Sequence, residues 1–275
     1  MTIGEVLKRS TEYLERQGVE SARPDAERLL AHGLGLTRIE LYTDHDRPLT
    51  ESELAAARAL VERRGAREPL AYILGEWGFR KLVLKTDARA LVPRPETEVL
   101  VDRAIALLQG VVEPRIVDVG TGTGAIALAL AQEVPGARVT AIDVSGEALS
   151  LARENMERAG LEVHLLRRDL REGLPGGPYD LVASNPPYVE EHELAELDPE
   201  VRDFEPRLAL VGDDVPEHVA RAALAGLRPG GALVMEIHAE RAEANAALLE
   251  QLGYTEVRLT IDLTGRDRVV EGRLP

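Results

Sequence analysis

From residue 97 to the end of the chain, the apolar and polar positions alternate between two patterns. Short runs rich in Val, Ile and Leu predict buried strands, and longer amphipathic runs between them predict helices. We expect strands at 115–119, 138–142, 163–167, 179–184, 232–237 and 256–261, and helices at 98–108, 125–133, 146–159, 217–227 and 239–252. This order is typical of a mostly parallel, doubly wound α/β sheet. Such sheets bind ligands beyond the carboxyl ends of their strands, so the residues that follow each strand are the candidates for a site.

The residues before this region follow a different pattern, in which apolar positions recur at helical spacing between polar turns. An opening helix is followed by a second one at 25–34, with Pro24 close to its start. Thr50 and Glu53 form a capping-box pattern ahead of a third helix at 54–64. This part of the chain therefore predicts a small bundle of three helices, whose role is either substrate recognition or packing.

The stretch at 76–96 differs from both of its neighbours. It combines glycines, alternating Val and Leu, and two prolines, which is typical of a β-hairpin and its turns. We therefore expect three parts in the chain. They are an N-terminal helical substrate-recognition domain at 1–75, a β-hairpin linker at 76–96 and an α/β domain at 97–275.

The charge balance narrows the class of partner. The chain of 275 residues has 48 acidic and 33 basic side chains, and its formal net charge is −15. Binding to nucleic acid depends largely on Lys and Arg side chains that neutralise phosphates. An acidic chain with no evident basic patch therefore argues against direct nucleic-acid binding, whereas a positively charged protein partner would be attracted to it.

Several features that the sequence lacks bear on where the protein acts and what it binds. There is no cysteine, which excludes disulfides and thiolate metal sites. The charged N-terminus has no apolar signal segment, and the longest apolar run, at 125–131, is far too short to span a membrane. We therefore expect a cytoplasmic protein that binds no metal and no membrane. We also expect it to act as a monomer.

Three glycines follow the first strand of the α/β region. Gly120, Gly122 and Gly124 alternate with Thr121 and Thr123, directly before a predicted helix. Glycines permit positive φ and allow a ligand to approach the backbone closely, and a helix N-terminus offers free N–H groups. The alternating spacing differs from the dinucleotide-binding fingerprint. A tight strand-to-helix turn is the alternative interpretation, but such a turn does not need three glycines.

An acid ends the second strand. Asp143 can accept hydrogen bonds from both hydroxyls of a ribose. The alternative is that Asp143 caps the helix that follows, although Ser145 could serve as that cap and leave the carboxylate free. An NAD-dependent enzyme would carry the same acid, so Asp143 indicates a nucleoside ligand without naming it.

The most specific signal follows the fourth strand, where the chain reads Asn185, Pro186, Pro187 and Tyr188. The prolines stiffen the backbone and remove N–H donors, which leaves carbonyl oxygens beside the Asn185 side-chain oxygen. Tyr188 can pack its ring on a flat group. Together these residues predict a slot for a planar group that carries an –NH₂, rather than a simple proline-rich turn.

This slot suits transfer of a group to an amide-type or ring amino nitrogen. The lone pair of such a nitrogen is delocalised, so the nitrogen is a poor nucleophile. Acceptors that hold both of its hydrogens favour attack along one direction, and positioning with electrostatics then supplies most of the rate. If the transferred group is carried on a sulfonium, from which a neutral thioether leaves readily, the reaction requires no strong base and no metal.

The glycine loop, with Asp118 shortly before it, resembles motif I of class I methyltransferases, which use S-adenosylmethionine. By this resemblance the loop cradles the amino-acid part of the cofactor. Asp169, after the third strand, would lie near the adenine amine, and Leu170 would cover the base. Asp169 could equally be an ordinary loop residue. Relatives often carry an aromatic residue at the position of Leu170.

Further segments make the likeness more specific. Together with the Asn-Pro-Pro-Tyr tetrad, they resemble the HemK/PrmC family, the peptide chain release factor N5-glutamine methyltransferases. The matching segments are 67–75, 91–98, 204–210 and 263–268. The likeness covers the chain from about residue 65 onward, with a weaker helical match before it. The stretch 211–216 departs from the family's glycine-rich pattern, so no functional residue is assigned there.

The resemblance implies a class I, Rossmann-like methyltransferase domain with a helical bundle and a hairpin linker. The implied reaction moves a methyl group from S-adenosylmethionine to the glutamine amide nitrogen of the Gly-Gly-Gln motif of class 1 release factors, which act in translation termination, and yields S-adenosylhomocysteine. The Asn185 side chain and the Pro186 carbonyl would hold the –NH₂, Pro187 would shape the slot, and Tyr188 would pack on the amide plane. The cofactor-binding residues would be Gly120, Thr121, Gly122, Thr123, Gly124, Asp143, Asp169, Leu170 and Asn185.

Other functions remain open at this point. A related enzyme could methylate a glutamine of a ribosomal protein with the same tetrad. An adenine-N6 methyltransferase would place a flipped base in the same slot, although the net charge argues against it. A nucleoside-binding module without catalysis would leave the tetrad with no purpose.

Overall fold

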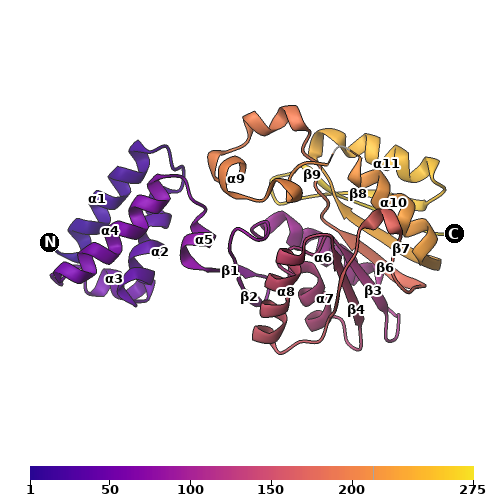
Figure 1. Ribbon diagram of the computed structural model, residues 1–275, viewed down its shortest axis with the longest axis horizontal. Coiled ribbons are helices and arrows are strands. Elements are labelled where there is room, and N and C mark those ends of the chain that lie inside the picture. The colour runs from indigo at the N-terminus through magenta and orange to yellow at the C-terminus, as the bar shows by residue number, and fades with distance from the viewer. Residues whose placement is uncertain (213) are drawn as a thin grey trace. The chain divides into compact units, whose positions relative to one another are not determined.

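The computed structural model describes residues 1–212 and 214–275, which form two compact units. One unit contains Met1–Glu76 together with Asp198–Phe204. The other contains Trp77–Leu197 and Glu205–Pro275. Figure 1 shows helices alone in the first unit and a sheet flanked by helices in the second. None of the helices in the described residues is long and apolar enough to cross a membrane.

The first unit is a helical bundle. Its helices are α1 (Ile3–Arg16), α2 (Ala22–Leu34), α3 (Arg38–Thr43), α4 (Glu51–Gly65) and α5 (Leu70–Leu74). Capping boxes begin α1, α3 and α4, and leucines of α1 and α2 fill the core. The sequence predicted only three helices, because α3 and α5 are too short to show an apolar periodicity.

A short helix from later in the chain completes this bundle. Helix α9 (Pro199–Phe204) carries Glu200, whose carboxylate lies 2.8 Å from the Arg64 guanidinium and 2.5 Å from that of Arg67. Arg64 is buried and also pairs with Asp25 at 2.7 Å. These ion pairs explain why a segment that follows the Asn-Pro-Pro-Tyr tetrad clusters with the first seventy-six residues.

The second unit contains a seven-stranded sheet with the order β5-β4-β3-β6-β7-β9-β8. Strands β5, β4, β3, β6 and β7 run parallel, and β9 pairs antiparallel with both β7 and β8. Their bounds are β3 (Arg115–Val119), β4 (Arg138–Asp143), β5 (His164–Arg167), β6 (Tyr179–Ser184), β7 (Leu227–Glu236), β8 (Thr255–Ile261) and β9 (Asp267–Arg273). A separate hairpin pairs β1 (Glu76–Phe79) with β2 (Leu82–Lys85).

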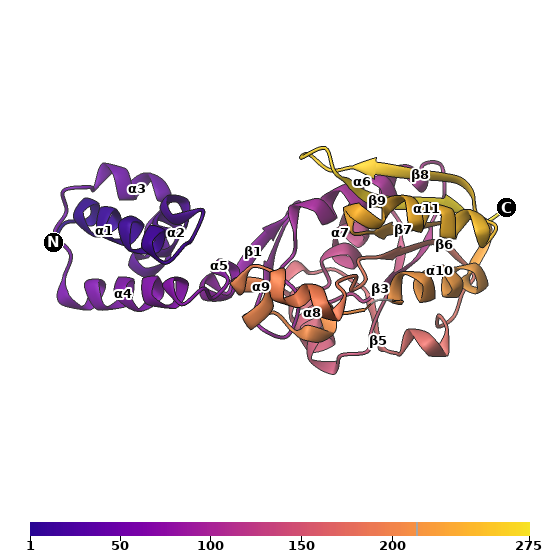
Figure 2. The ribbon, with the colours of Figure 1, turned by 90° about the horizontal axis from the view of Figure 1, so that it is seen from above.

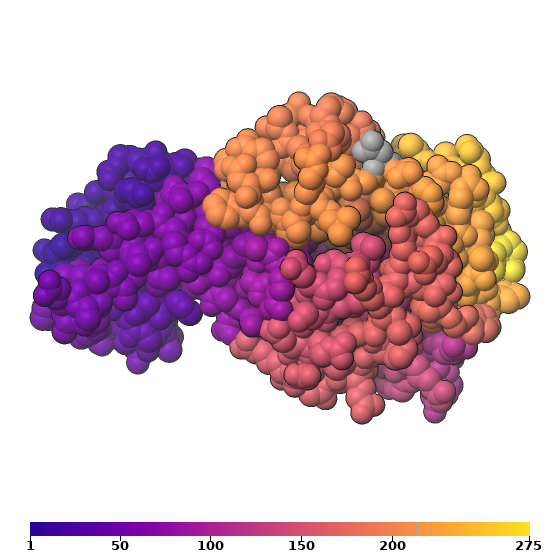
Figure 3. Space-filling model, in the orientation of Figure 1, coloured from indigo at the N-terminus to yellow at the C-terminus, as the bar shows by residue number. Residues whose placement is uncertain are grey.

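Helices cover both faces of this sheet. One apolar core lies under α6 (Pro95–Leu107), α7 (Ala125–Glu133) and α8 (Gly146–Ala159), and the other lies under α10 (Val215–Gly226) and α11 (Ala242–Gln251). Figure 2 shows α11 alongside the strands at the C-terminal edge. In Figure 3 the orange and yellow C-terminal part of the chain lies against its magenta and red middle part. The predicted class I, Rossmann-like fold is confirmed.

Two features of the sheet unit differ from the expectation. Strand β9 was missed, because the charged side chains in 267–273 break the apolar run by which buried strands are recognised. Short helical turns also follow β6, at Glu191–Glu196 and Arg207–Ala209, where no element was expected. Of the divergent stretch 211–216, Asp213 lies outside the described residues, and Val211 forms a bridge with Val189.

Candidate active site

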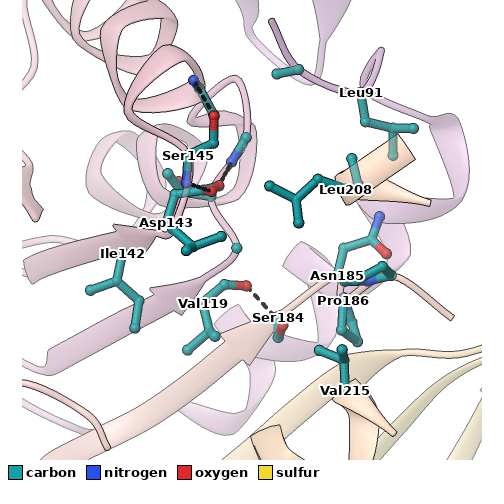
Figure 4. Close-up of a pocket in the computed structure, with 18 of the residues that line it drawn as sticks. Leu91, Val119, Ile142, Asp143, Ser145, Ser184, Asn185, Pro186, Leu208 and Val215 are labelled. Atoms are coloured by element: carbon teal, nitrogen blue, oxygen red, sulfur yellow. Dashed lines mark hydrogen bonds between the residues drawn. The ribbon is translucent and has the colours of Figure 1, made fainter. Parts of the chain in front are cut away.

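A cavity of about 440 Å³ opens at the carboxyl ends of β3, β4 and β6. Most of the residues that the sequence analysis selected lie on its wall. They are Gly120, Thr121, Gly122, Thr123, Asp143, Asp169, Leu170, Asn185, Pro186 and Pro187. Gly124 and Tyr188 are not among the described residues that line the cavity. Figure 4 shows Leu91, Leu208 and Asn185 across the cavity from Asp143.

The glycine loop forms the floor of the cavity. All three glycines have positive φ, at 72° for Gly120, 56° for Gly122 and 84° for Gly124. A Cβ on Gly124 would lie 3.2 Å from Leu128 and 3.3 Å from Ala152, so this glycine permits close packing between the loop and α8. Gly120 and Gly122 have more open surroundings and expose backbone to the cavity.

Asp118, at the buried end of β3, holds this loop in place. Its Oδ2 accepts hydrogen bonds from Thr121 Oγ1 at 2.6 Å and from the Ala127 N–H at 3.2 Å. The other oxygen, Oδ1, is buried and has no hydrogen-bond partner among the described residues. Complete burial raises the pKa of Asp118 to about 7, and the charge of Asp143 contributes in the same direction. The side chain therefore supports the loop rather than facing a ligand.

Asp143 connects the loop to the next helix. Its two carboxylate oxygens accept from the Gly122 N–H at 3.0 Å and the Ser145 N–H at 2.9 Å. Ser145 caps α8, since its hydroxyl oxygen accepts from the Ala148 N–H at 3.1 Å. Burial raises the pKa of Asp143, although these N–H groups oppose the shift. Each carboxylate oxygen retains acceptor capacity, and Asp143 lines the cavity.

Asp169 and Leu170 lie at the wall beyond β5. The Asp169 carboxylate accepts from the Arg171 backbone N–H at 2.9 Å and pairs with the Arg171 guanidinium at 2.5 Å. These contacts lower the pKa of Asp169 to about 2, so the group is ionised at neutral pH. Leu170 contributes apolar surface to the same wall. Asp169 therefore combines a local structural role with a place at the cavity.

Asn185 follows β6 at the edge of the cavity. Its Nδ2 donates to Thr97 Oγ1 at 3.2 Å, which fixes the amide against the first turn of α6. The preceding residue, Ser184, donates from its hydroxyl to the Val119 carbonyl at 2.8 Å and so joins β6 to β3. Pro186 and Pro187 continue the cavity wall. The strand end thus places one amide and two rigid residues beside the glycine loop.

Tyr188 contacts the protein interior behind this wall. Its hydroxyl donates to Glu236 Oε1 at 3.4 Å, and its ring centroid lies 6.0 Å from that of His238 with the ring planes tilted by 55°. Burial raises the pKa of Tyr188 well above its usual value, so the hydroxyl keeps its proton. Its backbone carbonyl accepts from Arg241 at 2.5 Å. These contacts hold the end of the tetrad in place.

Known proteins match this chain along its length. The PrmC N-terminal domain model matches residues 5–75, and the methyltransferase small domain model matches residues 97–198. The release factor glutamine methyltransferase of Deinococcus radiodurans is 44% identical over 99% of this chain and 99% of its own. The chain belongs to the release factor glutamine methyltransferase family. The enzyme of that name from Rhodopirellula baltica is 42% identical over 98% of this chain and 95% of its own.

Solved structures agree with the fold of this release factor glutamine methyltransferase family member. A methyltransferase from Pyrococcus furiosus has a TM-score of 0.53 and 19% identity, and the match covers 80% of this chain and 97% of that one. At that identity the likeness concerns the fold alone. It supports the class I assignment for the sheet unit.

Two of the segments that carried the family resemblance meet at the cavity. The Arg94 guanidinium lies 2.7 Å from the buried carboxylate of Glu205, which also accepts from the Val92 N–H at 3.3 Å. This pair holds Leu91 and Leu208 on the cavity wall, where 60% of the Leu208 surface remains exposed. The joint presence of the 91–98 and 204–210 segments in this family member thus has a structural reason.

The sequence analysis missed Thr97, which lines the cavity, and Glu236, which lies behind it. Both are buried, and the Thr97 hydroxyl donates to Glu236 Oε2 at 2.6 Å. Thr97 lay inside a matched segment but received no role. Glu236 had a detectable signal, because it is a single charged residue at the carboxyl end of an otherwise apolar strand run.

Proposed function

We propose that this protein transfers a methyl group from S-adenosylmethionine to the side-chain amide nitrogen of the glutamine in the Gly-Gly-Gln motif of class 1 release factors. One observation carries the proposal. The Asn185–Pro187 segment and the glycine loop line the same cavity, so a nucleoside cofactor and a planar –NH₂ group would meet there. The family of the chain supports the same substrate class.

The cavity fits the cofactor in three respects. Gly120 and Gly122 have positive φ and little around them, so a ligand can lie against their backbone. The Asp143 carboxylate, already held by two N–H groups, can accept from a ribose diol. Leu170 offers apolar surface to a base. When bound, S-adenosylmethionine supplies a methyl group on a positively charged sulfonium.

The tetrad then orients the glutamine amide that accepts the methyl group. We assign the Asn185 Oδ1 atom and the Pro186 carbonyl oxygen to the two hydrogens of the glutamine –NH₂. Pro187 has no N–H that could compete for these acceptors and keeps the backbone rigid. Holding both hydrogens fixes the direction in which the nitrogen faces the methyl donor, and most of the rate comes from this positioning. Tyr188 anchors the end of the slot from behind the cavity wall. It is not among the described residues that line the cavity, so we give its ring no contact with the amide plane.

The remaining parts of the proposal concern partners and setting. The helical unit is assigned to contact with the release factor, and the net charge of −15 favours a protein partner over direct nucleic-acid contact. Because its substrates act in translation, the protein is placed in the cytoplasm. It is proposed to act as a monomer without a metal or a membrane.

A comparison of substrates tests the proposal. Purified protein with labelled S-adenosylmethionine is offered a class 1 release factor, the same factor with the motif glutamine changed to alanine, total ribosomal proteins, and adenine-containing nucleic acid. We expect label only in the unaltered release factor. Label in ribosomal proteins or in adenine, with none in the release factor, would replace the proposed substrate.

A further inference from the structure

Three polar side chains from distant parts of the chain form one continuous line from the cavity wall into the interior. Asn185 Nδ2 lies 3.2 Å from Thr97 Oγ1, and Thr97 Oγ1 lies 2.6 Å from Glu236 Oε2. They come from the end of β6, the first turn of α6 and the end of β7. Thr97 and Glu236 are 4% and 2% exposed, so water cannot readily replace either contact.

While Glu236 is ionised, the chemistry of these groups fixes the direction of each hydrogen bond. An ionised carboxylate only accepts, so the single hydroxyl hydrogen of Thr97 is committed to Glu236. Thr97 Oγ1 can then offer only a lone pair to its other neighbour. The atom of Asn185 that faces Thr97 must therefore be the –NH₂ and not the carbonyl oxygen. The amide orientation follows from Glu236, two hydrogen bonds away.

We propose that Thr97 and Glu236 are positioning residues that hold the Asn185 amide with its Oδ1 atom toward the substrate –NH₂. The inference rests on the proposed function and deepens it. In the opposite orientation Asn185 would present its own –NH₂ to that of the substrate, and two donors repel each other. The first turn of α6 thus controls a hydrogen bond at the reacting nitrogen.

The same carboxylate also holds Tyr188. The hydroxyl of Tyr188 donates to Glu236 Oε1, while Thr97 donates to Oε2. One carboxylate oxygen therefore receives its hydrogen from the first turn of α6, and the other receives its hydrogen from the tetrad. Glu236 orients both the first and the last residue of the tetrad.

The charge of Glu236 depends on its surroundings. Arg268 of β9 and the two hydroxyls favour the ionised form, and Glu96 in the first turn of α6 opposes it. Burial outweighs these contacts and raises the pKa of Glu236 to about 7. Below that pH a protonated Glu236 can donate to Thr97, whose hydrogen then turns to Asn185 and favours the reversed amide. Protonation of Glu236 should thus turn the Asn185 amide away from its productive orientation and lower kcat.

Kinetic constants of the full-length variants Thr97→Val, Thr97→Ser and Glu236→Gln test the proposal. We expect Thr97→Val to lower kcat about 10-fold or more, with little change in KM for the release factor or in affinity for S-adenosylhomocysteine. Thr97→Ser keeps the hydroxyl and should recover most of kcat. Glu236→Gln, which cannot change its charge, should remove the acidic fall in kcat near pH 7.

Glu271→Gln serves as a matched control. Glu271 is also buried in the sheet, but its carboxylate pairs with Arg103 at 2.7 Å and not with Thr97 or Tyr188. We expect this variant to retain the acidic fall in kcat. If Thr97→Val kept its kcat, or if Glu271→Gln altered the pH profile as Glu236→Gln does, the positioning role would be wrong.

A spectroscopic readout separates this inference from the proposed function. The Asn185 side-chain –NH₂ signals in a ¹H–¹⁵N NMR spectrum should move in Thr97→Val and return in Thr97→Ser, whether or not any substrate is present. In the unaltered protein they should also move with pH as Glu236 titrates. If these signals stay the same in Thr97→Val and across the pH range, the inference would be overturned even in an active enzyme. A protein that shows the shifts but does not methylate release factors would refute the function instead.

Discussion

Arg94 and Glu205 lie 111 positions apart in the chain and form an ion pair of 2.7 Å beside the cavity. Glu205 is 6% exposed, and burial raises its pKa despite the neighbouring guanidinium. A buried carboxylate requires its partner, because an uncompensated charge in the interior is costly. The pair fixes the 204–210 segment, and with it Leu208, on the cavity wall.

We therefore expect Arg94→Met to destabilise the protein by about 3 kcal/mol and to weaken substrate binding. Urea unfolding at pH 8 and KM for the release factor would measure the two effects. Arg138→Met is a matched control, because Arg138 pairs with Glu113 at the surface, where the two side chains are 72% and 61% exposed. That variant should change stability by less than about 1 kcal/mol. Equal effects of the two variants would contradict the role given to Glu205.

Asp118 predicts a dependence of stability on pH. Its pKa is about 7 in the folded protein, against about 3.9 in an unfolded chain. Because the folded-state pKa is the higher one, the favourable contribution of Asp118 to the free energy of unfolding is complete below about pH 4. It is then lost as the pH rises through about 7. Glu236 contributes in the same direction, since its pKa is raised in the same way.

The variant Asp118→Asn isolates the first of these contributions. An amide has no charge to bury, so the free energy of unfolding should fall less between pH 5 and pH 8 than it does in the unaltered protein. Urea unfolding across that range measures the difference. Asp180→Asn is a control, because Asp180 is a partly exposed carboxylate whose partners are Arg115 and Arg228. A pH dependence that is the same in the unaltered protein and in Asp118→Asn would contradict the assignment.

Asp143 should govern cofactor affinity. Replacing it by alanine removes the proposed ribose acceptor and frees the Gly122 and Ser145 N–H groups. We expect the affinity for S-adenosylhomocysteine to fall about 10-fold or more, as the loss of a charged hydrogen-bond acceptor requires. Isothermal titration calorimetry measures this directly. Asn185→Ala should keep nearly full affinity, and a larger loss there than in Asp143→Ala would reverse the two roles.

Much of this architecture could be predicted from the sequence, because buried parallel strands and amphipathic helices have strong periodicities. Strand β3 and helix α7 were predicted with their observed bounds, and the glycine loop was placed correctly between them. Strand β9 was not predicted, because Arg268 and Glu271 interrupt its apolar run. A strand that contains charged residues can be predicted only when the partners of those residues are known.

The cavity was partly predictable for a different reason. Residues that follow parallel strands gather at one edge of the sheet, so the sequence alone places Asp143 and Asn185 at the same edge. The roles of Thr97 and Glu236 could not be predicted in this way, because their hydrogen bond joins residues 139 positions apart. Tyr188 shows the same limit, since its contact with Glu236 depends on the register of β7 beside β6.

Tandem mass spectrometry of a class 1 release factor after incubation with the protein and S-adenosylmethionine tests the central claim most directly. The account predicts one added methyl group on the side-chain nitrogen of the Gly-Gly-Gln glutamine. It should be nearly absent with Asn185→Ala and present with Asn245→Ala, a matched change on α11 outside the cavity. An unmodified glutamine in the presence of active protein, or full modification by Asn185→Ala, would contradict it.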